Sequence, residues 1–408
     1  MINLYIINES SLGAVYGIGT YIRELTSALK NSNMNVCVVQ LRSIAPDIVL
    51  EESEDTRYLH IPSPVSRNKK LDRNRQNELY YRNVVYLLQL QIKETDHLVF
   101  QLNYNQNGIL AEYLKKTFNC KIVAAAHYSD WGLIIYDNIQ RLRSILSKEQ
   151  PDSFEQNVKN VFEAENLLYS KADRVICLSN YMNEILCSEY RLDPTKITTI
   201  PNGLTDTVKT IADKNNLRKK WKITPREKII LFVGRMDEVK GLVYLIRCFR
   251  SVLDKYPSCR LIIAGNGNYD SYIQYAKNIN TKISFTGLLE KNELYELYQI
   301  ANVGVVPSLF EQFGYVALEM MMHGLPVVAT ATSGLNEVVD ETCGLKIPII
   351  GHPEKVEIDS TLLAQNILYL LQHPIEARKM GGNGRKRFLE WFELSVFRKN
   401  MLNLYHNL

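Results

Sequence analysis

The stretch VGVVPSLFEQFGYVALEMMMHGLPVVAT, residues 303–330, contains a strand, a loop, a helix and a second strand. Gly324 and Pro326 end the helix, since glycine caps helix C-termini and proline cannot continue them. Two strands joined through a helix form a parallel pair. Glu311 and Glu319 interrupt this apolar segment, and burying a carboxylate is costly unless a partner pairs with it. The stretch therefore predicts a parallel sheet and a polar site beside it.

The same alternation of apolar strands and amphipathic helices extends on both sides of this stretch. INLYII, VCVVQL, HLVFQL, KIVAAA and RVICLS precede a polar, basic connector, and IILFVG, LIIAG, KISFTG, VGVVPS and PVVAT follow it. Apolar strands separated by helices predict α/β structure with parallel sheets covered on both faces. We expect two Rossmann-like halves joined near residue 205, with ligands at the carboxyl ends of the strands, in the cleft between the halves.

Composition narrows the class of protein. A chain of 408 residues is too long for one ordinary core, and 46% hydrophobic with 23% charged residues is typical of a globular protein. The net charge of +4 is too small to indicate a nucleic-acid partner, and no apolar run reaches the roughly 18 residues that cross a bilayer. Seven cysteines without a Cys-x-x-Cys pair favour free thiols in a reducing cytoplasm.

VGRMDEVKGLVYL places two cations where a strand ends and a helix begins. Arg235 follows the strand directly, and Lys240 is expected to open the helix. Two cations beside a helix N-terminus suit an anion such as a diphosphate, because arginine offers a flat fork of donors and lysine a mobile charge. Two solvated surface cations near Asp237 and Glu238 explain the pattern equally well.

The loop of the opening stretch carries Glu311 to the same edge of the sheet. Gly314 permits close approach of the backbone, and the helix that begins near Tyr315 offers free N–H groups. Glu319 lies about one turn inside this helix, where we expect it to look toward the same cleft as Glu311. Carboxylates accept hydrogen bonds and match vicinal sugar hydroxyls. The alternatives are a salt bridge for Glu319 and a solvated loop acid for Glu311.

Two further candidates lie in the N-terminal half. Gly17 and Gly19 are expected to form a flexible turn before a helix. A dinucleotide-binding fingerprint needs a third glycine where this chain has Ile22, so the fingerprint is incomplete. We interpret this turn as a backbone cradle for phosphate or sugar, or as an ordinary loop. His127 ends the strand KIVAAA, where it could exchange a hydrogen bond with a reacting hydroxyl or bond to a neighbouring loop.

In this order, these stretches resemble the retaining glycosyltransferases of family 4, which have the GT-B architecture and a C-terminal domain like that of glycogen synthase and phosphorylase. The run from Glu311 through Phe313 and Gly314 to Glu319 is similar to the E-x7-E element of that family, and GRMDEVKG is similar to its Gly-Arg-x4-Lys-Gly element. GIGTY, His127, IPNG and IAGNG match more weakly. WFELSVFRKNMLNLYHNL resembles the helix that crosses back to the N-terminal domain.

This resemblance implies two domains that face each other across a cleft. An acceptor-side domain would span 1–205 together with the crossing helix 392–408, and a nucleotide-sugar-binding domain would span 206–391. The implied activity is that of a hexosyltransferase-type enzyme that moves a sugar from a nucleotide-diphosphate donor, most commonly a UDP-sugar, to a hydroxyl of a glycan, lipid-linked or peptide acceptor.

The resemblance also assigns roles to single residues. Arg235 and Lys240 would hold the donor diphosphate and stabilise the charge that develops on it. Glu319 would accept from the ribose hydroxyls, and Glu311 would hold the transferred sugar. The remaining implied contacts are the backbone N–H groups of Phe313, Gly314 and Tyr315, Gly287 and Leu288 near the base, Gly17 and Gly19 from the opposing domain, and His127 beside the sugar or acceptor. After IPNG the chain departs from the family pattern, so Asp206 receives no donor role.

The family retains the anomeric configuration of the transferred sugar. The usual proposal is a front-face route, in which the leaving diphosphate takes the proton of the acceptor hydroxyl. This route agrees with the lack of a glycosidase-type carboxylate pair in the sequence. The sequence contains no Asp-x-Asp, no metal-ligand cluster and no Walker lysine, so we expect neither a metal nor another cofactor. Two alternatives stay open: a sugar-nucleotide epimerase on the same architecture, and an inactive binding subunit.

The segment 66–76, SRNKKLDRNRQ, contains five basic residues and Asp72 as its single acid. It could approach an anionic lipid surface or a phosphorylated acceptor. A solvated helix face is the favoured interpretation, because most charge runs mean no more than that. We therefore expect a cytoplasmic protein, and contact of 66–76 with the inner face of the membrane as the alternative.

Overall fold

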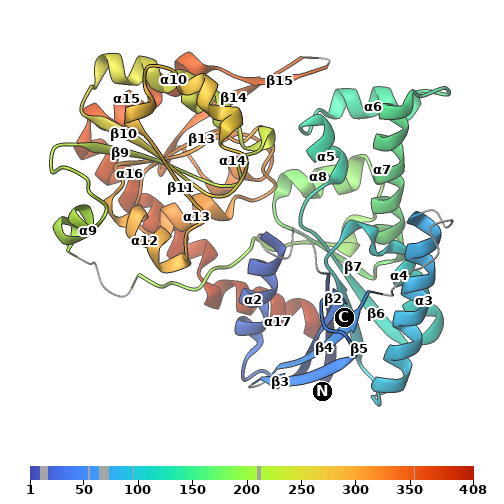
Figure 1. The fold of residues 1–408 in the computed structure, drawn as a ribbon. Coiled ribbons are helices and arrows are strands. Elements are labelled where there is room, and N and C mark those ends of the chain that lie inside the picture. The colour runs from blue at the N-terminus through green and yellow to red at the C-terminus, as the bar shows by residue number, and fades with distance from the viewer. Residues whose placement is uncertain (10–16, 54–55, 64–72, 95, 209–212, 353) are drawn as a thin grey trace. The chain divides into compact units, whose positions relative to one another are not determined.

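The computed structural model describes residues 1–9, 17–53, 56–63, 73–94, 96–208, 213–352 and 354–408. The chain forms two compact units (Figure 1). The first unit contains Met1–Trp131, Ile145–Gly203 and Leu394–Leu408, and the second contains Gly132–Ser144 and Leu204–Glu393. Residues Gly132–Ser144 differ from the predicted division at residue 205, because they group with the second unit although they lie early in the chain.

This short segment is tied into the second unit by side chains. Tyr136 packs against the hydrophobic core of that unit, and Asp137 accepts a hydrogen bond of 2.5 Å from the Ser333 hydroxyl. Asn138 donates to the His352 carbonyl at 2.9 Å. Strand and helix periodicity carries no signal for such contacts between distant parts of the chain, so the sequence pattern could not predict them.

An eight-stranded sheet organises the first unit, in the order β3-β4-β2-β1-β5-β6-β7-β8. All neighbouring strands are parallel except β3 and β4, which pair antiparallel at the edge. The strands are β1 (Ile2–Glu9), β2 (Met34–Ser43), β3 (Val49–Ser53), β4 (Thr56–Pro62), β5 (Leu98–Leu102), β6 (Cys120–Ala126), β7 (Arg174–Cys177) and β8 (Ile197–Thr199).

Helices pack on this sheet because each strand return is an amphipathic helix. They are α2 (Gly17–Leu29), α3 (Arg73–Gln91), α4 (Gly108–Thr117), α5 (Asp130–Ile135), α6 (Ile139–Ser147), α7 (Ser153–Lys171), α8 (Asn180–Ser188) and the C-terminal α17 (Leu394–His406), of which α5 and α6 extend into the segment that groups with the second unit. Helix α17 buries Phe397, Met401 and Leu404 in one core with residues of α2 and β1. The last helix of the chain therefore belongs to the first unit.

The second unit contains a seven-stranded sheet in the order β11-β10-β9-β12-β13-β14-β15. It is parallel except for the antiparallel pair of β14 and β15 at one edge. The strands are β9 (Lys228–Val233), β10 (Cys259–Ala264), β11 (Ile283–Gly287), β12 (Val303–Val306), β13 (Val327–Ala331), β14 (Gly344–Gly351) and β15 (Val356–Ile358). The predicted class, two α/β units built on parallel sheets, is confirmed.

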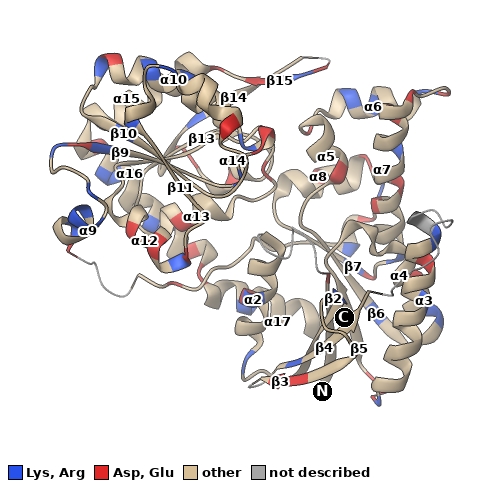
Figure 2. Ribbon diagram, in the orientation of Figure 1, with Lys and Arg blue, Asp and Glu red and all other residues tan. Residues whose placement is uncertain are grey.

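The helices of the second unit connect these strands. They are α9 (Lys214–Lys220), α10 (Leu242–Lys255), α11 (Asp270–Ile273), α12 (Lys291–Ile300), α13 (Tyr315–Met322), α14 (Leu335–Val338), α15 (Ser360–Gln372) and α16 (Pro374–Arg387). Figure 2 shows acidic and basic residues interspersed along the helices of each unit, which fits the small net charge of +4.

The order of the strands locates the natural ligand position of the second unit. From β9 the chain proceeds to β10 and β11 on one side, and then returns to β12 and β13 on the other side. The strand order therefore reverses between β9 and β12, which pair directly. In open α/β sheets, ligands bind beyond the carboxyl ends of the strands at such a switch point.

Candidate functional site

The loop after β9 carries the two predicted cations to the switch point. Arg235 Nη2 lies 3.0 Å from Asp237 Oδ2, and another oxygen of this carboxylate accepts from the Lys240 backbone N–H at 3.2 Å. Asp237 thus caps a single 3-10 turn, Glu238–Lys240, before α10 begins at Leu242. Lys240 stands in this turn, and the expectation that it opens the long helix is wrong by two residues.

A salt bridge joins the two loops of the switch point. Lys240 Nζ lies 2.5 Å from Glu311 Oε2, and the exposed fractions of the two side chains are 22% and 20%. The Leu309 N–H donates to the Val239 carbonyl at 2.7 Å, which fastens one loop to the other. The structure therefore brings Lys240 and Glu311 together, although 71 positions separate them in the chain.

Backbone geometry at two glycines permits this approach. Gly241 has a φ of +65°, and a Cβ atom there would lie 1.8 Å from the Pro307 carbonyl oxygen. Gly314 has a φ of +97° and directly precedes α13. Residues with a side chain rarely adopt such angles, so glycine is required where the Lys240 and Glu311 loops touch and where α13 begins.

The residues between the two glutamates are mostly buried. Phe313 packs its ring against Tyr315 and Phe392, with centroids 5.6 and 5.9 Å away. Gln312 is 4% exposed, and its side-chain nitrogen finds no acceptor among the described residues. The first N–H groups of a helix have no partner within that helix. The start of α13 therefore combines backbone donors with a buried amide donor beside Glu311.

Glu319 has a protein partner on the neighbouring helix. Its Oε2 accepts a hydrogen bond of 2.9 Å from the hydroxyl of Tyr298 on α12. Burial, together with the Glu319 carboxylate, raises the pKa of Tyr298 well above its ordinary value, so this phenol stays protonated and donates. The structure joins Glu311 to Lys240 and Glu319 to Tyr298. The hydrogen bond from Tyr298 gives the Glu319 carboxylate a protein partner.

Of the predicted base-side residues, Gly287 ends β11 and Leu288 follows it, at the carboxyl end of this strand. The Gly287 carbonyl accepts from the Gly265 N–H at 2.9 Å, so these two loops are joined. Leu288 is 66% exposed. An exposed apolar side chain beside a fixed backbone offers apolar contact and peptide groups to a planar ring.

Within the first unit, Gly17 and Gly19 are part of helix α2. The helix begins at Gly17, so both glycines stand in its first turn, and the expected flexible turn before the helix is wrong for these two positions. The reason is that the first turn of a helix needs no intrahelical N–H bond and tolerates glycine. Both residues still present backbone N–H groups at the amino end of α2.

His127 follows β6 and is 9% exposed. Its Nε2 lies 3.0 Å from Asn103 Oδ1, and the Asn103 amide nitrogen donates to the Ile7 carbonyl at 2.9 Å. Asn103 Oδ1 must therefore accept, so His127 Nε2 carries the proton and Nδ1 is an acceptor. Burial lowers the pKa of His127 to about 3, which keeps the ring neutral at physiological pH.

Sequence reasoning missed the polar network that holds His127. Gln101 donates to Asn103 Oδ1 at 3.1 Å and to the Tyr21 hydroxyl at 3.0 Å. The hydroxyl of Tyr405, in the C-terminal helix, donates to the Gln101 side-chain oxygen. A signal exists in the sequence, because QLNYNQN places an amide side chain at every second position where strand β5 ends, and all four of these amides are buried.

Asp206, which received no donor role, has a structural partner. Its two oxygens accept from Arg385 Nη1 and Nη2 at 2.8 and 2.6 Å. This hydrogen bonding lowers the pKa of Asp206. The bidentate pair fixes the start of the second unit to α16.

The remaining expectations concern metals, membranes and thiols. Among the described residues, no three His, Cys, Asp or Glu side chains gather as metal ligands, and no helix is long and apolar enough to span a bilayer. All seven cysteines are free. Most of segment 66–76 lies outside the described residues. Arg75, in α3, forms an ion pair of 2.6 Å with Glu78.

Solved structures with a similar fold cover the whole chain. Sucrose-phosphate synthase from Thermosynechococcus elongatus matches with a TM-score of 0.78 and 24% identity, over 100% of this chain and 99% of that one. HepE of Anabaena in complex with UDP-glucose matches with a TM-score of 0.72 and 16% identity, over 100% of both chains. Two α/β units of this kind define the GT-B fold.

Two family models divide the chain between them. The model described as Glycosyltransferase Family 4 matches residues 15–207, and the model described as Glycosyl transferases group 1 matches residues 213–387. Each half of the chain is therefore similar to one part of the GT-B glycosyltransferases that these models describe.

Curated relatives match over part of their length. An uncharacterized glycosyltransferase of Methanocaldococcus jannaschii is 34% identical over 46% of this chain and 49% of its own length. A D-inositol 3-phosphate glycosyltransferase of Corynebacterium aurimucosum is 28% identical over 62% of this chain and 60% of its own length. The chain thus spans about half to three fifths of these relatives.

Proposed function

We propose that this protein is a retaining glycosyltransferase that uses a UDP-sugar donor and transfers a hexose to a hydroxyl of a glycan, lipid-linked or peptide acceptor. The observation that carries the proposal is the Lys240–Glu311 pair, 2.5 Å apart, at the switch point beside the N-terminus of α13. A cation and a carboxylate at this position suit the two parts of such a donor, a diphosphate and a sugar.

The cations of the site bind the diphosphate in this proposal. Arg235 supplies a planar fork of donors and Lys240 a point charge, and the N-terminus of α13 adds backbone N–H groups. As the glycosidic bond breaks, negative charge grows on the diphosphate, and these groups stabilise it where it develops. They supply the charge neutralisation that a metal ion would otherwise provide, so we propose a metal-independent reaction.

Carboxylates and backbone groups hold the sugar and the nucleoside. Glu311 accepts from hydroxyls of the transferred sugar, while Lys240 keeps this carboxylate in place when no donor is bound. The buried amide of Gln312 is a further donor at this position. Glu319, oriented by Tyr298, accepts from the ribose, and the backbone of Gly287 and Leu288 lies beside the base.

The first unit serves the sugar and the acceptor. His127 carries its proton on Nε2, so it offers Nδ1 as an acceptor to a sugar hydroxyl. Gly17 and Gly19 offer N–H groups at the start of α2. In the front-face route, the bond from the anomeric carbon to the leaving diphosphate breaks while the acceptor oxygen forms its new bond on the same face. The diphosphate oxygen then takes the acceptor proton, so the route needs no protein base.

Names of similar proteins support the choice of UDP. HepE, which shares the fold, has been solved with UDP and with UDP-glucose. Several curated relatives are named as D-inositol 3-phosphate glycosyltransferases. These names support a UDP-sugar donor and a polyhydroxylated acceptor as the first candidates to test.

The first test combines a donor screen with an activity assay. Thermal-shift measurements with UDP-, GDP- and ADP-sugars should show the largest rise in melting temperature with a UDP-sugar, because a ligand that binds only the folded state stabilises it. With that donor, Glu311→Ala and Lys240→Ala should each reduce release of UDP by about 100-fold or more, the usual loss on removing one transition-state contact.

The matched control is Lys220→Ala, because Lys220 forms an exposed ion pair of 2.7 Å with Glu296 elsewhere in the same unit. This variant should keep full activity, since exposed ion pairs contribute little. Full activity of both site variants would overturn the assignment. Conversion of the donor into another sugar nucleotide without an acceptor would indicate the epimerase instead.

A further inference from the structure

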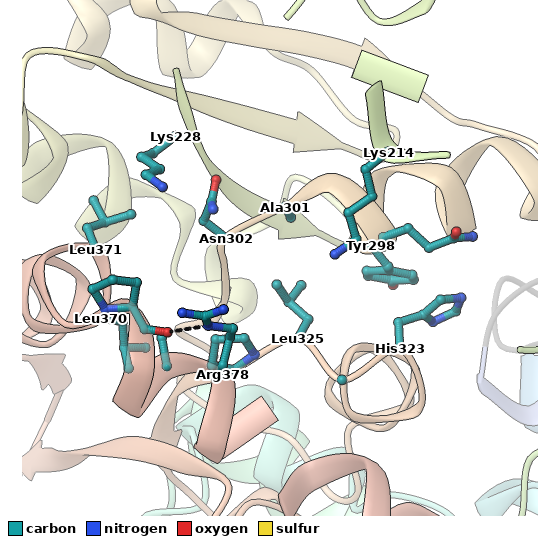
Figure 3. A pocket seen from close by; sticks show the side chains of 15 residues that line it. Lys214, Lys228, Tyr298, Ala301, Asn302, His323, Leu325, Leu370, Leu371 and Arg378 are labelled. Atoms are coloured by element: carbon teal, nitrogen blue, oxygen red, sulfur yellow. Dashed lines mark hydrogen bonds between the residues drawn. The ribbon is translucent and has the colours of Figure 1, made fainter. Parts of the chain in front are cut away.

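A pocket lies in the second unit where strands of its sheet begin, at the opposite end of these strands from the proposed donor site. It has a volume of about 390 Å³ and is lined by residues where β9, β12 and β13 begin, including Pro326 and, as Figure 3 shows, Lys228 and Asn302. The proposed donor site stands at the carboxyl ends of the same strands. Pockets of roughly 300–1,000 Å³ are the usual size for small ligands.

The walls of this pocket are basic. Lys214, Lys228 and Arg378 line it from α9, β9 and α16, and none of the described residues that line it is acidic (Figure 3). Among the described residues, no ion pair involves any of these three cations. Arg378 bonds through Nε to the Pro374 carbonyl at 3.2 Å, which fixes the guanidinium while its terminal nitrogens keep their donors.

Helix dipoles offer a competing explanation. Helices α12, α13 and α15 end at this pocket, and cations stabilise the carbonyl ends of helices. However, no hydrogen bond joins Lys214 Nζ or Lys228 Nζ to a carbonyl in the described part of the chain. Asn302 also supports an anionic ligand. Its side-chain oxygen accepts from the Ile229 N–H at 2.9 Å, so its amide nitrogen is left as a donor.

Apart from Gln299, the rest of the described lining is apolar or aromatic. Leu325, Pro326 and Leu371 are buried lining residues, and the ring of Tyr298 forms part of the wall. Three cations with an amide donor suit a phosphate group, and an aromatic ring with aliphatic side chains suits the carbon face of a sugar ring. We infer that this pocket binds a small sugar phosphate as a regulatory ligand.

The pocket is connected to the proposed donor site through Glu319. Two residues that line the pocket contact Glu319. The Tyr298 hydroxyl donates to Glu319 Oε2 at 2.9 Å, and His323 Nδ1 donates to the Glu319 backbone carbonyl at 2.8 Å. A ligand against both rings restrains the α12–α13 contact and thereby the position of Glu319, so it tightens nucleotide binding. This coupling rests on the proposed role of Glu319, whereas binding in the pocket does not.

The experiment titrates the full chain with glucose 6-phosphate by calorimetry, with equal ionic strength of NaCl as the blank. Lys228→Met and Arg378→Met remove the charge and keep most of the aliphatic stem, so each should weaken binding about tenfold or more. The control is Lys379→Met, which removes a positive charge at the next position of α16, and Lys379 is not among the described residues that line the pocket. Melting temperatures verify that every variant folds.

Affinity for UDP is then measured with and without saturating glucose 6-phosphate. We expect a tightening of about fivefold or more, which disappears in Arg378→Met. The pocket would be overturned as a site if glucose 6-phosphate did not bind. It would also be overturned if all three variants, the control included, weakened binding equally or left it unchanged. Binding without any effect on UDP affinity would overturn the coupling. Failure of UDP to bind at all would contradict the proposed function and leave the result for the pocket standing.

Discussion

His127 illustrates at the scale of one residue how the surroundings select a chemical state. The sequence pattern allowed this histidine to donate or to accept. In the structure, Asn103 uses its nitrogen for the Ile7 carbonyl, so only its oxygen can face His127. The ring is therefore a neutral acceptor, and burial opposes any second proton.

This state has a measurable consequence for stability. Because the pKa of His127 is about 3 in the folded chain and about 6.5 when unfolded, only the unfolded chain takes up this proton as the pH falls between these values. Stability should fall with decreasing pH in that window, by at most about 1.4 kcal/mol per pH unit from this residue. Urea unfolding of the wild type and of His127→Gln, at several pH values from 7 to 4, measures the difference.

His127→Gln keeps a side-chain donor and loses the titration, so its unfolding free energy should depend less steeply on pH than that of the wild type. All other titrating groups are common to both proteins and cancel in the comparison. Equal slopes for the two proteins would contradict a buried, neutral His127.

At the scale of elements, the Lys240–Glu311 pair depends on the fit of two loops. The 3-10 turn Glu238–Lys240 and the loop before α13 meet where Gly241 touches the Pro307 carbonyl. Each loop follows one of two neighbouring parallel strands, so the sheet brings them together and the glycine lets them touch. The geometry of the pair is therefore a property of the β9–β12 edge as well as of its two side chains.

Gly241→Ala tests this contact. The new Cβ would lie 1.8 Å from a backbone oxygen, and the φ of +65° is strained for alanine. We expect a loss of about 2 kcal/mol or more in the free energy of unfolding, together with reduced donor binding. Denaturant unfolding and the UDP titration measure the two effects.

Gly382→Ala in α16 is the matched control. Gly382 is exposed within the helix, and a Cβ atom there meets nothing within 4 Å. Alanine should stabilise this helix by about 0.5–1 kcal/mol, so the same substitution has opposite signs at the two positions. A neutral Gly241→Ala would show that the two loops do not need this close contact.

At the scale of the whole molecule, the chain crosses between its units more than once. Segment Leu394–Leu408 completes the core of the first unit after the second unit has been built. Tyr405 reaches the Gln101 amide, which in turn bonds to the partner of His127. The end of the chain therefore supports a proposed site residue near its beginning.

Phe397→Ala should accordingly destabilise the first unit. Phe397 is 2% exposed, packs edge-on to Tyr21 with centroids 5.8 Å apart, and fills the space beside Gly203. Its removal should cost about 3–5 kcal/mol, the usual range for a buried phenylalanine. Phe154→Ala on α7 makes the same change at 40% exposure and should cost about 1 kcal/mol or less. Thermal unfolding compares them, and equal losses would contradict the packing of α17.

Much of the site could be predicted because its signals are local. Arg235 and Glu311 lie in the loops that follow two apolar strands, and parallel strands present their carboxyl ends on one side of the sheet. Contacts between distant parts of the chain could not be predicted in this way. Tyr298, on a different helix, donates a hydrogen bond to one carboxylate oxygen of Glu319. Residues Gly132–Ser144 group with the second unit, although most of that unit comes later in the chain.

The sequence by itself determined the α/β class, most of the strands, and the loops that carry the candidate residues, because periodicity and strand ends depend on neighbouring positions. Only the tertiary structure decided which side chains meet. The Lys240–Glu311 pair, the proton on His127 Nε2 and the basic pocket beneath Glu319 each join segments far apart in the chain. Such contacts depend on burial and distance in three dimensions, which no local pattern encodes.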